Sequence, residues 1–499
     1  MRPVLTRAEM AEVDALAGRE VGVEVLVRRA GTAAAHAALS MLGGAYGRRV
    51  VVVAGKGHNG DDGRIAAGLL ERRGARVVVL PPAAGVDPGA ASGTGPVALP
   101  ACHLVVDAAF GTGFRGSYRA PAVPQRPDGR GPATVLAVDI PSGVDSDTGE
   151  AGPSAVWADR TVTFGALKPG LLLGAGPDHA GEVRVEPIGL PVGQGALSLV
   201  EDADVARLLP PRRRDGHKWD RAVYVAAGSP GMLGAAALAA TGAGRAGAGM
   251  LRLGSPGVPP GSVPVTEAVA RPLPPAGWAD AVLAELGRCK ALVVGPGLGT
   301  GPETAESLRR LVAEAPVAVV VDADGLSVAG SADELSRLAD RRTAPLVLTP
   351  HDGEYARLAG ARPGPDRVAA ARDLARRVRA TVLLKGSPTV VAEPGGSALL
   401  VSSGSARLST AGSGDVLSGV IGAFLARGLE PLQAAGLAAH VHGRAAALGG
   451  GEGLLAGDLP RLVADVLDSI GPRAAASRVA GAGAPGTGSG SEAGARDGR

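Results

Sequence analysis

The chain has 499 residues, 45% of them hydrophobic and 20% charged, values that are typical of a folded protein with more than one domain. Its 51 basic and 48 acidic residues leave a net charge of +3, too small a surplus to indicate nucleic acid as a partner. Only two cysteines are present, Cys102 and Cys289, far apart and without CxxC spacing, so neither a disulfide framework nor a zinc site is indicated.

Two helices and no export signal are predicted for the first forty residues. Met10, Val13 and Ala17 recur at helical spacing, and a second helical stretch runs from about residue 23 to 42. This segment carries charges throughout and lacks the apolar core of a signal peptide. No run approaches the roughly 18 apolar residues of a membrane span. We therefore expect a cytoplasmic protein without membrane association.

Four valine-rich runs follow, near residues 50, 77, 105 and 137. Continuous apolar runs of this kind are typical of strands that are buried on both faces, and hence of a parallel sheet flanked by helices. Ligands bind such sheets at the carboxyl ends of the strands. The polar residues at these strand ends are therefore the first candidates for a site.

The first strand end carries the segment GKGHNGDDG, residues 55–63, at the start of a predicted helix. Its glycines allow close backbone approach, and the helix start offers free amide donors, so a phosphate or a ribose can bind there. A glycine-rich segment can equally be a plain turn. The polar residues Asn59, Asp61 and Asp62 favour the binding interpretation.

Two further strand ends carry Asp107 in VDAAFGTGFRG and Asp139 with Ser142 in VDIPSGVDSDTG. In one parallel sheet these ends converge on one crevice. The oxygen groups of Asn59, Asp107 and Ser142 suit a hard monovalent cation, because no sulfur or paired histidine is nearby in the sequence. Asp139 remains as the acid–base residue, although an aspartate there can also serve only to cap the following turn.

These three motifs, in this order, resemble the NAD(P)H-hydrate epimerase family over residues 1–195. The resemblance implies a Rossmann-like, three-layer α/β/α domain, a potassium ion, and epimerisation at carbon 6 of the hydrated nicotinamide ring. The potassium ligands would be Asn59, Asp107 and Ser142. The substrate contacts it implies are His58, Asn59, Gly60, Asp61, Asp62, Gly111, Thr112, Gly113, Phe114, Arg115, Gly116, Ser117 and Asp139.

His58 and Asp61 depart from the family's usual asparagine and glycine residues at this place. The carboxylate of Asp61 adds negative charge near a phosphate-bearing substrate, which weakens binding unless it points away or pairs with Lys56.

A domain boundary is predicted between residues 195 and 196, where proline and charged residues become frequent. The basic cluster at residues 212–214 is either a binding patch or a solvated linker, and its neighbouring prolines favour the linker. The second domain would span residues 196–470. The remaining segment, residues 471–499, is rich in Gly, Ala and Ser and is predicted to be a disordered tail.

The second half again alternates between apolar strands and polar turns, with strands predicted near residues 222, 291, 317, 345 and 380. Its strongest signal is the segment STAGSGDVLSGVIGAFLARG, residues 409–428. The amides of Gly412, Ser413 and Gly414 can face a transferring phosphoryl group, with Asp415 beside them as a base. The alternative is a plain helix cap. Gly-x-Gly-Asp at a helix start resembles the anion hole of ribokinase-like enzymes.

Companion motifs narrow this resemblance to the ADP-dependent NAD(P)H-hydrate dehydratases, over about residues 200–470. They are GSPGMLGAAALAATGAGRAGAGMLRL from residue 228, VVGPGLGT, DADGL, TPHDGE and LLKGSPTVV. The resemblance implies a C-terminal ribokinase-like α/β domain. It also implies nucleotide contacts at Lys385, Gly386, Ser387, Pro388, Thr389 and Gly414, and contacts to the hydrated dinucleotide at Ala235, Gly297, His351 and Asp415. His351 can also be an ordinary polar residue after a strand.

The implied reaction begins when Asp415 deprotonates the ring hydroxyl, which takes the terminal phosphoryl group of ADP. Loss of phosphate then restores the double bond and gives NADH or NADPH, AMP and phosphate. The nucleotide is expected to bring Mg²⁺ held largely by water and phosphate. The partners expected are therefore hydrated NADH or NADPH and ADP, and the family's tendency to assemble allows a homo-oligomer.

One alternative function is a ribokinase-like kinase for vitamins or hydroxymethylpyrimidines, with a non-catalytic binding module in front. It predicts a stable phosphorylated product and ATP as donor. The polar convergence of Asn59, Asp107, Asp139 and Ser142 argues against a non-catalytic front domain, because a scaffold has no need of it.

Overall fold

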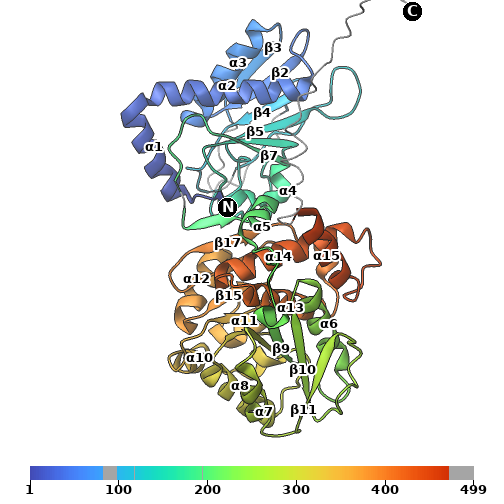
Figure 1. Ribbon diagram of the computed structural model, residues 1–499. Coiled ribbons are helices and arrows are strands. Elements are labelled where there is room, and N and C mark those ends of the chain that lie inside the picture. Colours follow the sequence, from blue (N-terminus) through green and yellow to red (C-terminus); the bar gives the residue numbers. More distant parts are fainter. Residues whose placement is uncertain (83–97, 117, 194, 471–499) are drawn as a thin grey trace, which may run out of the picture.

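The computed structural model describes residues 1–82, 98–116, 118–193 and 195–470. The chain forms two bodies, each built around its own β-sheet with helices packed on it (Figure 1), so the predicted α/β class with two units is confirmed. Ser117 and the predicted tail at residues 471–499 lie outside the described residues. Among the residues that are described, no helix combines the length and apolarity needed to cross a membrane.

The front body contains a sheet of six parallel strands in the order β3–β2–β4–β5–β6–β7. The four predicted valine-rich runs are confirmed as its first four strands. The strands are β2 (Arg49–Ala54), β3 (Arg76–Leu80), β4 (Leu104–Ala108), β5 (Thr134–Val138), β6 (Arg160–Phe164) and β7 (Glu182–Glu186).

Alternating residues of β2 serve the two faces of this sheet, as the period of a strand requires. Val50 and Val52 pack beneath α2 (Val23–Leu42) and α3 (His58–Arg72), and Val51 and Val53 face the opposite side. Among the described residues, that second face is covered by the connecting segments around Cys102, Tyr118 and Val156. The predicted helix near the N-terminus is α1 (Arg7–Val21), which packs on α2.

The second body contains an eleven-stranded sheet in the order β1–β8–β17–β16–β15–β14–β13–β12–β9–β10–β11. The strands from β15 to β11 run parallel, and β16 is antiparallel to both of its neighbours. The bounds are β1 (Arg2–Pro3), β8 (Leu197–Leu199), β9 (Ala222–Ala226), β10 (Met250–Pro256), β11 (Ala268–Leu273), β12 (Ala291–Val294), β13 (Ala318–Val321), β14 (Leu346–Leu348), β15 (Thr381–Leu384), β16 (Thr389–Ala392) and β17 (Ala398–Val401).

Helices cover both faces of the second sheet. One face holds α6 (Leu233–Arg245), α13 (Ser413–Ala426), α14 (Pro431–Leu448) and α15 (Leu459–Ile470). The other face holds α7 (Ala279–Leu286), α8 (Pro302–Glu314), α10 (Ala332–Ala339) and α12 (Arg367–Val378). Shorter helices are α4 (Gly176–Ala180), α5 (Asp202–Leu208), α9 (Asp324–Val328) and α11 (Asp352–Ala359), with single turns at Pro169–Leu171, Lys218–Arg221 and Ala406–Leu408.

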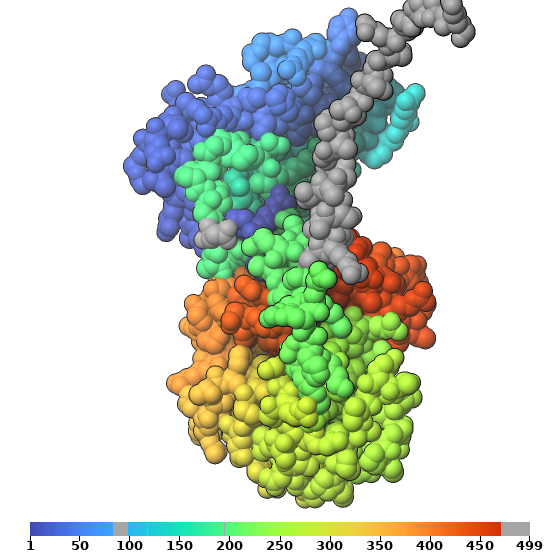
Figure 2. Space-filling view, viewed as in Figure 1, coloured from blue at the N-terminus to red at the C-terminus, as the bar shows by residue number. Residues whose placement is uncertain are grey.

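The first residues of the chain belong to the second sheet, not to the first. Strand β1 pairs with β8, and the Val4 amide donates to the Leu197 carbonyl. The next amide, of Leu5, donates to the Leu167 carbonyl of the front body. Figure 2 shows the green segment that follows β8 lying over the junction of the two bodies. The boundary at residues 195 and 196 stays a prediction. The structure adds that β1, which precedes the front body in the chain, pairs with a strand of the second body.

Candidate active sites

The first candidate site is a cavity of about 650 Å³ at the carboxyl ends of β2, β4, β5 and β6. Its polar lining includes His58, Asn59, Asp62 and Asp139, as the strand-end argument predicts. Its apolar wall, which the sequence did not reveal, comes mainly from α1 and α2 and from the ends of β6 and β7: Met10, Val23, Leu26, Val27, Ala30, Phe164, Ile188 and Leu190.

Asp139 is held ionised at the floor of this cavity. Its Oδ1 accepts from Lys168 Nζ at 2.8 Å and from Thr163 Oγ1 at 3.3 Å, and its Oδ2 accepts from the Thr112 amide at 3.0 Å. Burial raises the pKa of the carboxyl, but the charge and hydrogen bond of Lys168 outweigh it, so the pKa lies below its usual range. Asp139 has φ of 71°, a strained backbone that is concentrated at functional sites. Asp139 is therefore ionised at neutral pH and available to accept a proton.

Lys168 is the principal residue of this site that sequence reasoning missed. Its side chain is 1% exposed, and besides Asp139 its Nζ donates to Thr163 Oγ1 at 2.7 Å and to the Phe164 carbonyl at 2.9 Å. It lies in FGALKPG, directly after β6. The rule that polar residues at strand ends form the site would have found it, had this strand been predicted.

The segment after β2 begins α3 against the sheet. A Cβ on Gly60 would lie 2.0 Å from the Gly55 carbonyl oxygen, so only glycine fits there. Asp61 points outward and pairs with Arg64 at 2.9 Å, its side chain 48% exposed. The predicted alternative of a pair with Lys56 is therefore not what the structure shows.

Asn59 has both side-chain amide atoms buried and without a hydrogen-bond partner among the described residues. Buried polar groups rarely remain in this condition unless they face a ligand. Asp107 and Ser142 lie deeper and bond to each other, since Ser142 donates from its Oγ and its amide to the carboxylate at 2.8 Å each. Burial raises the pKa of Asp107 to about 6, although the Ser142 hydrogen bonds oppose it. Asn59 and Ser142 thus offer neutral oxygen atoms to a cation, and Asp107 offers a carboxylate oxygen when it is ionised.

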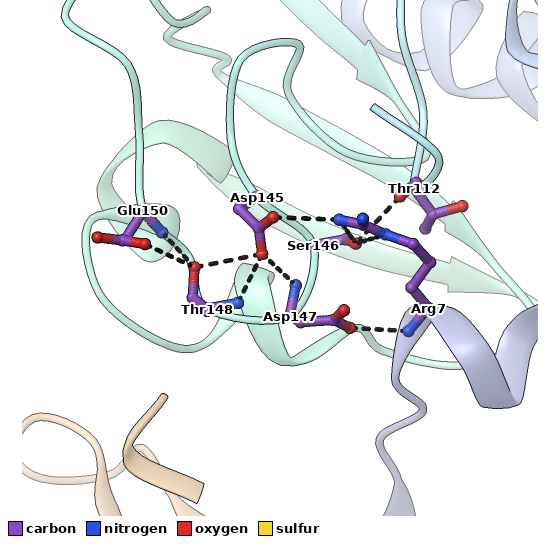
Figure 3. A network of polar contacts seen from close by, with 7 residues as sticks. All are labelled: Arg7, Thr112, Asp145, Ser146, Asp147, Thr148 and Glu150. Carbon is purple, nitrogen blue, oxygen red and sulfur yellow. Dashed lines mark hydrogen bonds and ion pairs between the residues drawn. The ribbon is translucent and has the colours of Figure 1, made fainter. Parts of the chain in front are cut away.

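The loop that carries Gly111 and Thr112 is tied to the start of α1 (Figure 3). Ser146 Oγ donates to the Thr112 carbonyl at 3.2 Å, and the Arg7 guanidinium donates to Ser146 Oγ at 3.1 Å. Arg7 also pairs with Asp145 at 3.1 Å, and its amide donates to Asp147 Oδ1 at 2.7 Å. The N-terminal helix therefore positions a loop whose Thr112 amide contacts Asp139.

The cavity gathers most of the predicted front contacts, but not all. Its lining includes His58, Asn59, Asp62, Gly111, Thr112, Gly113, Phe114 and Asp139. It does not include Gly60, Asp61, Arg115 or Gly116, and Ser117 lies outside the described residues. Asp107 and Ser142 lie behind the wall. Asp14 of α1 and Lys56 line the cavity and were not predicted.

The second candidate site is a cavity of about 860 Å³ at the carboxyl ends of the second sheet, beside the N-terminus of α13. The predicted nucleotide residues Lys385, Gly386, Ser387, Thr389 and Gly414 line it, together with His351. Pro388 is absent from this lining. The structure thus brings together residues from β15, β16 and α13, which are separated in the sequence.

A charged cluster lies at one side of this cavity. Lys385 Nζ donates to Asp322 Oδ1 at 2.6 Å, while Asp322 Oδ2 is buried without a partner among the described residues. Burial and the negative charge of Asp322 raise the pKa of Asp415 to about 7, although Lys385 opposes the shift. A carboxyl with this pKa can exchange a proton near neutral pH.

The predicted contacts to the hydrated dinucleotide fall in two places. Ala235 and Gly297 lie together, since a Cβ on Gly297 would be 2.8 Å from the Ala235 Cβ. His351 begins α11 as its cap, its Nδ1 accepting from the Gly353 amide at 3.0 Å and from the Glu354 amide at 3.3 Å. The sequence left open that His351 is an ordinary polar residue after a strand, and the capping role of its Nδ1 agrees with that alternative. Its ring is 56% exposed and lines the nucleotide cavity.

Three further residues of this cavity were not singled out. Arg367 bonds to Asp352 and to the Lys385 carbonyl, both at 2.8 Å, and so fixes the loop after β15. His442 of α14 is buried, and its Nε2 has no partner among the described residues. Burial lowers the pKa of His442 to about 4, so the ring is neutral. His440 and His442 both lie in this alanine-rich helix, and the local sequence gives no signal of a binding role.

Two family models match the chain. One, described as NAD(P)H-hydrate dehydratase, matches residues 223–467, and the other, described as YjeF-related protein N-terminus, matches residues 23–170. A solved structure of the ADP/ATP-dependent NAD(P)H-hydrate dehydratase from Bacillus subtilis, co-crystallised with ATP and Mg²⁺, is 31% identical. It covers 55% of this chain and 98% of that chain, with a TM-score of 0.49.

Relatives that match along most of the chain are named bifunctional NAD(P)H-hydrate repair enzyme Nnr. The Salinibacter ruber protein is 38% identical over 95% of this chain and 96% of its own length. The Moorella thermoacetica protein is 35% identical over 94% of this chain and 97% of its own length. The Mycobacterium tuberculosis protein is 42% identical, with coverages of 79% and 82%.

Proposed function

Because the chain belongs to the family of bifunctional NAD(P)H-hydrate repair enzymes, we propose that it restores hydrated NADH and NADPH with two active sites. The front cavity interconverts the R and S hydrates at carbon 6. The second cavity dehydrates the S hydrate at the expense of ADP and yields NAD(P)H, AMP and phosphate. A cytoplasmic location and assembly into a homo-oligomer stay predictions.

In the front site, Asp139 is the base, because Lys168 keeps its carboxylate ionised beside the cavity. The strand-end loops at residues 58–62 and 111–114 bind the substrate around it. The unpartnered Asn59 amide, with the oxygens of Asp107 and Ser142, fits K⁺. When bound, this ion would supply positive charge that orients the phosphate-bearing substrate.

In the second site, the residues hold ADP and move one proton. Lys385 and the backbone at residues 412–414 face the transferred phosphoryl group, and Asp415 accepts the proton of the ring hydroxyl. The hydroxyl oxygen then forms the new bond to phosphorus, and AMP leaves. Loss of phosphate from carbon 6 and transfer of the carbon 5 proton to water then restore the double bond. The unpartnered Asp322 Oδ2 fits Mg²⁺, which would neutralise phosphate charge.

The observation that supports this proposal most directly is the pair of separate cavities on one chain, each lined by charged side chains. A small-molecule kinase needs only the second cavity. The front cavity holds an ionised, lysine-bound Asp139 and a buried unpartnered Asn59, which a binding module without catalysis does not require.

The test uses the full chain with chemically hydrated NADPH, and follows the absorbance of restored NADPH with ADP, with ATP, or without nucleotide. Conversion that depends on ADP, releases phosphate and consumes the whole R and S mixture is expected. Asp139→Ala should stop near half conversion, apart from spontaneous epimerisation. A stable phosphorylated product and dependence on ATP would instead indicate the kinase.

The dehydratase rate should rise with pH through about 7, because Asp415 acts as a base only after it loses its proton and its pKa is about 7. Asp415→Asn should lower the rate by about 10² to 10⁴ and leave the epimerase unchanged. The measurement is kcat for the S hydrate between pH 5 and 9. A rate that falls over this range, or an active variant, would remove Asp415 from the role of base.

A further inference from the structure

Three carboxyl groups line the front cavity. Asp14 of α1 is exposed, whereas Asp62 and Asp139 are shielded from solvent and lie in contrasting surroundings. Asp139 accepts hydrogen bonds from Lys168, Thr163 and the Thr112 amide. Asp62, on the first turns of α3, is 6% exposed, and its Oδ1 is buried without a partner among the described residues. When the surroundings of two carboxyl groups in one site push their pKa values apart, one group can act as the acid and the other as the base.

The charges around Asp62 keep its proton in place. Asp14 faces it from α1, Asp61 lies on its own helix, and Asp139 lies beyond β5. The bases that line the cavity are Lys56, His58 and Lys168, of which Lys168 is bonded to Asp139. Burial and the three acids raise the pKa of Asp62 to about 8. At neutral pH Asp62 is therefore a carboxylic acid and Asp139 a carboxylate.

We propose that Asp62 is the general acid of the front site and works with Asp139 as base to open and re-form the hydrated ring. This inference rests on the proposed epimerase function and names the residue that completes it. Carbon 6 carries both a hydroxyl group and the ring nitrogen, so it can open to an aldehyde without any oxidant or reductant.

The opening step moves two protons. Asp139 takes the proton of the carbon 6 hydroxyl, whose oxygen forms the aldehyde double bond. The bond between carbon 6 and the ring nitrogen breaks, its electron pair goes to nitrogen, and nitrogen takes the proton of Asp62. Rotation about the bond between carbons 5 and 6 then presents the other aldehyde face.

Closure reverses these transfers. Nitrogen attacks carbon 6 and returns its proton to Asp62, while the oxygen takes back the proton held by Asp139. Each carboxyl group ends in its starting state, so one acid and one base complete a turnover. The hydroxyl oxygen stays on carbon 6 throughout.

The first measurement is kcat/KM for conversion of the R hydrate to the S hydrate between pH 6 and 10. We expect it to fall above about pH 8, because Asp62 loses its proton there. Asp62→Asn should lower the rate at pH 7 at least 100-fold and remove this falling limb, which a purely structural role would not do. The Asp62→Glu variant, which restores an acid, should recover part of the rate and the limb.

The matched control is Glu71→Gln, which removes an exposed carboxylate from the same helix, and it should keep the wild-type rate and profile. ADP-dependent dehydration of the S hydrate by the same preparations shows that the second body is intact in each variant, and the two thermal transitions of the chain show whether the front body is folded. In water labelled with ¹⁸O, a single turnover should leave the hydroxyl oxygen unlabelled.

The outcomes separate this inference from the proposed function. If the wild-type chain does not accelerate epimerisation, the front function itself is wrong. If it does, but Asp62→Asn keeps the rate, or the wild type lacks the limb near pH 8, Asp62 is not the acid. Obligatory ¹⁸O incorporation would overturn the ring-opening step, since it requires the hydroxyl group to leave.

Discussion

The two proposed bases, Asp139 and Asp415, are the same residue type in opposite electrostatic states. Lys168 lies 2.8 Å from Asp139 and holds its pKa below the usual range, whereas burial and Asp322 raise the pKa of Asp415 to about 7. The partner, and not the side chain itself, therefore decides when each carboxyl group titrates.

Lys168→Met should destabilise the front body by about 3 kcal/mol, because it leaves the buried Asp139 carboxylate without its cation. The folded pKa of Asp139 is depressed, so the pair stabilises the protein above the ordinary carboxyl range, and the effect is lost as pH falls through the folded pKa. Urea denaturation at pH 7 and at pH 3 measures this difference. The exposed Lys290→Met is the control. An equal loss at both pH values would contradict the pairing argument.

At the scale of elements, small residues decide how closely the helices of the second body approach. α6 and α13 lie side by side on one face of the sheet. A Cβ on Gly419 of α13 would lie 2.0 Å from the Ala239 carbonyl oxygen of α6. The contact is between backbones, so it cannot be relieved by a side-chain rotation. This close packing positions the start of α13, where Asp415 and the phosphoryl-facing amides lie.

Gly419→Ala should therefore destabilise the second body by about 1–3 kcal/mol or more, as overpacking does, and lower the dehydratase rate by displacing α13. Thermal unfolding together with dehydratase assays measures both effects. Gly287→Ala is the matched control, because a Cβ there meets nothing within 4 Å and its backbone is helical. A variant at Gly419 with unchanged melting temperature would show that the helices can separate at little cost.

At the scale of the whole molecule, the N-terminal segment joins the two bodies. Val4 is fully buried, its amide donates to Leu197, and it forms a bridge with Leu167, which precedes Lys168. The Met1 ammonium group pairs with Asp204 of α5 at 2.6 Å. The first four residues of the chain thus connect the edge strand β8 of the second body to Leu167 of the front body, which is next to Lys168.

Val4→Ala should lower the stability of both bodies by about 2 kcal/mol, since it removes apolar volume from their shared contact. Calorimetry, with loss of each activity on heating, gives the two transitions. The exposed Val123→Ala should change neither. If the melting temperature of only one transition falls, Val4 stabilises only one of the two bodies.

Much of the fold could be inferred from local patterns. The runs that became β9, β12 and β13, and β2 after Arg49, are continuously apolar because both faces of each strand are buried. β7, with the sequence EVRVE, and β10, whose Arg252 pairs with Glu285, were not predicted. Charged residues are tolerated in these strands because of their position in the sheet or because of a distant partner, and neither is visible in a short window.

The candidate sites divide in the same way. Asp139, Asn59 and Asp415 could be predicted because polar residues at the ends of buried strands, or at a glycine-rich helix start, depend only on local order. The pairing of Asp139 with Lys168 and the burial of Asp62 could not, because desolvation and partner choice depend on atoms from distant segments. The tertiary structure decides which carboxyl groups are charged, and it places β1 in the second sheet.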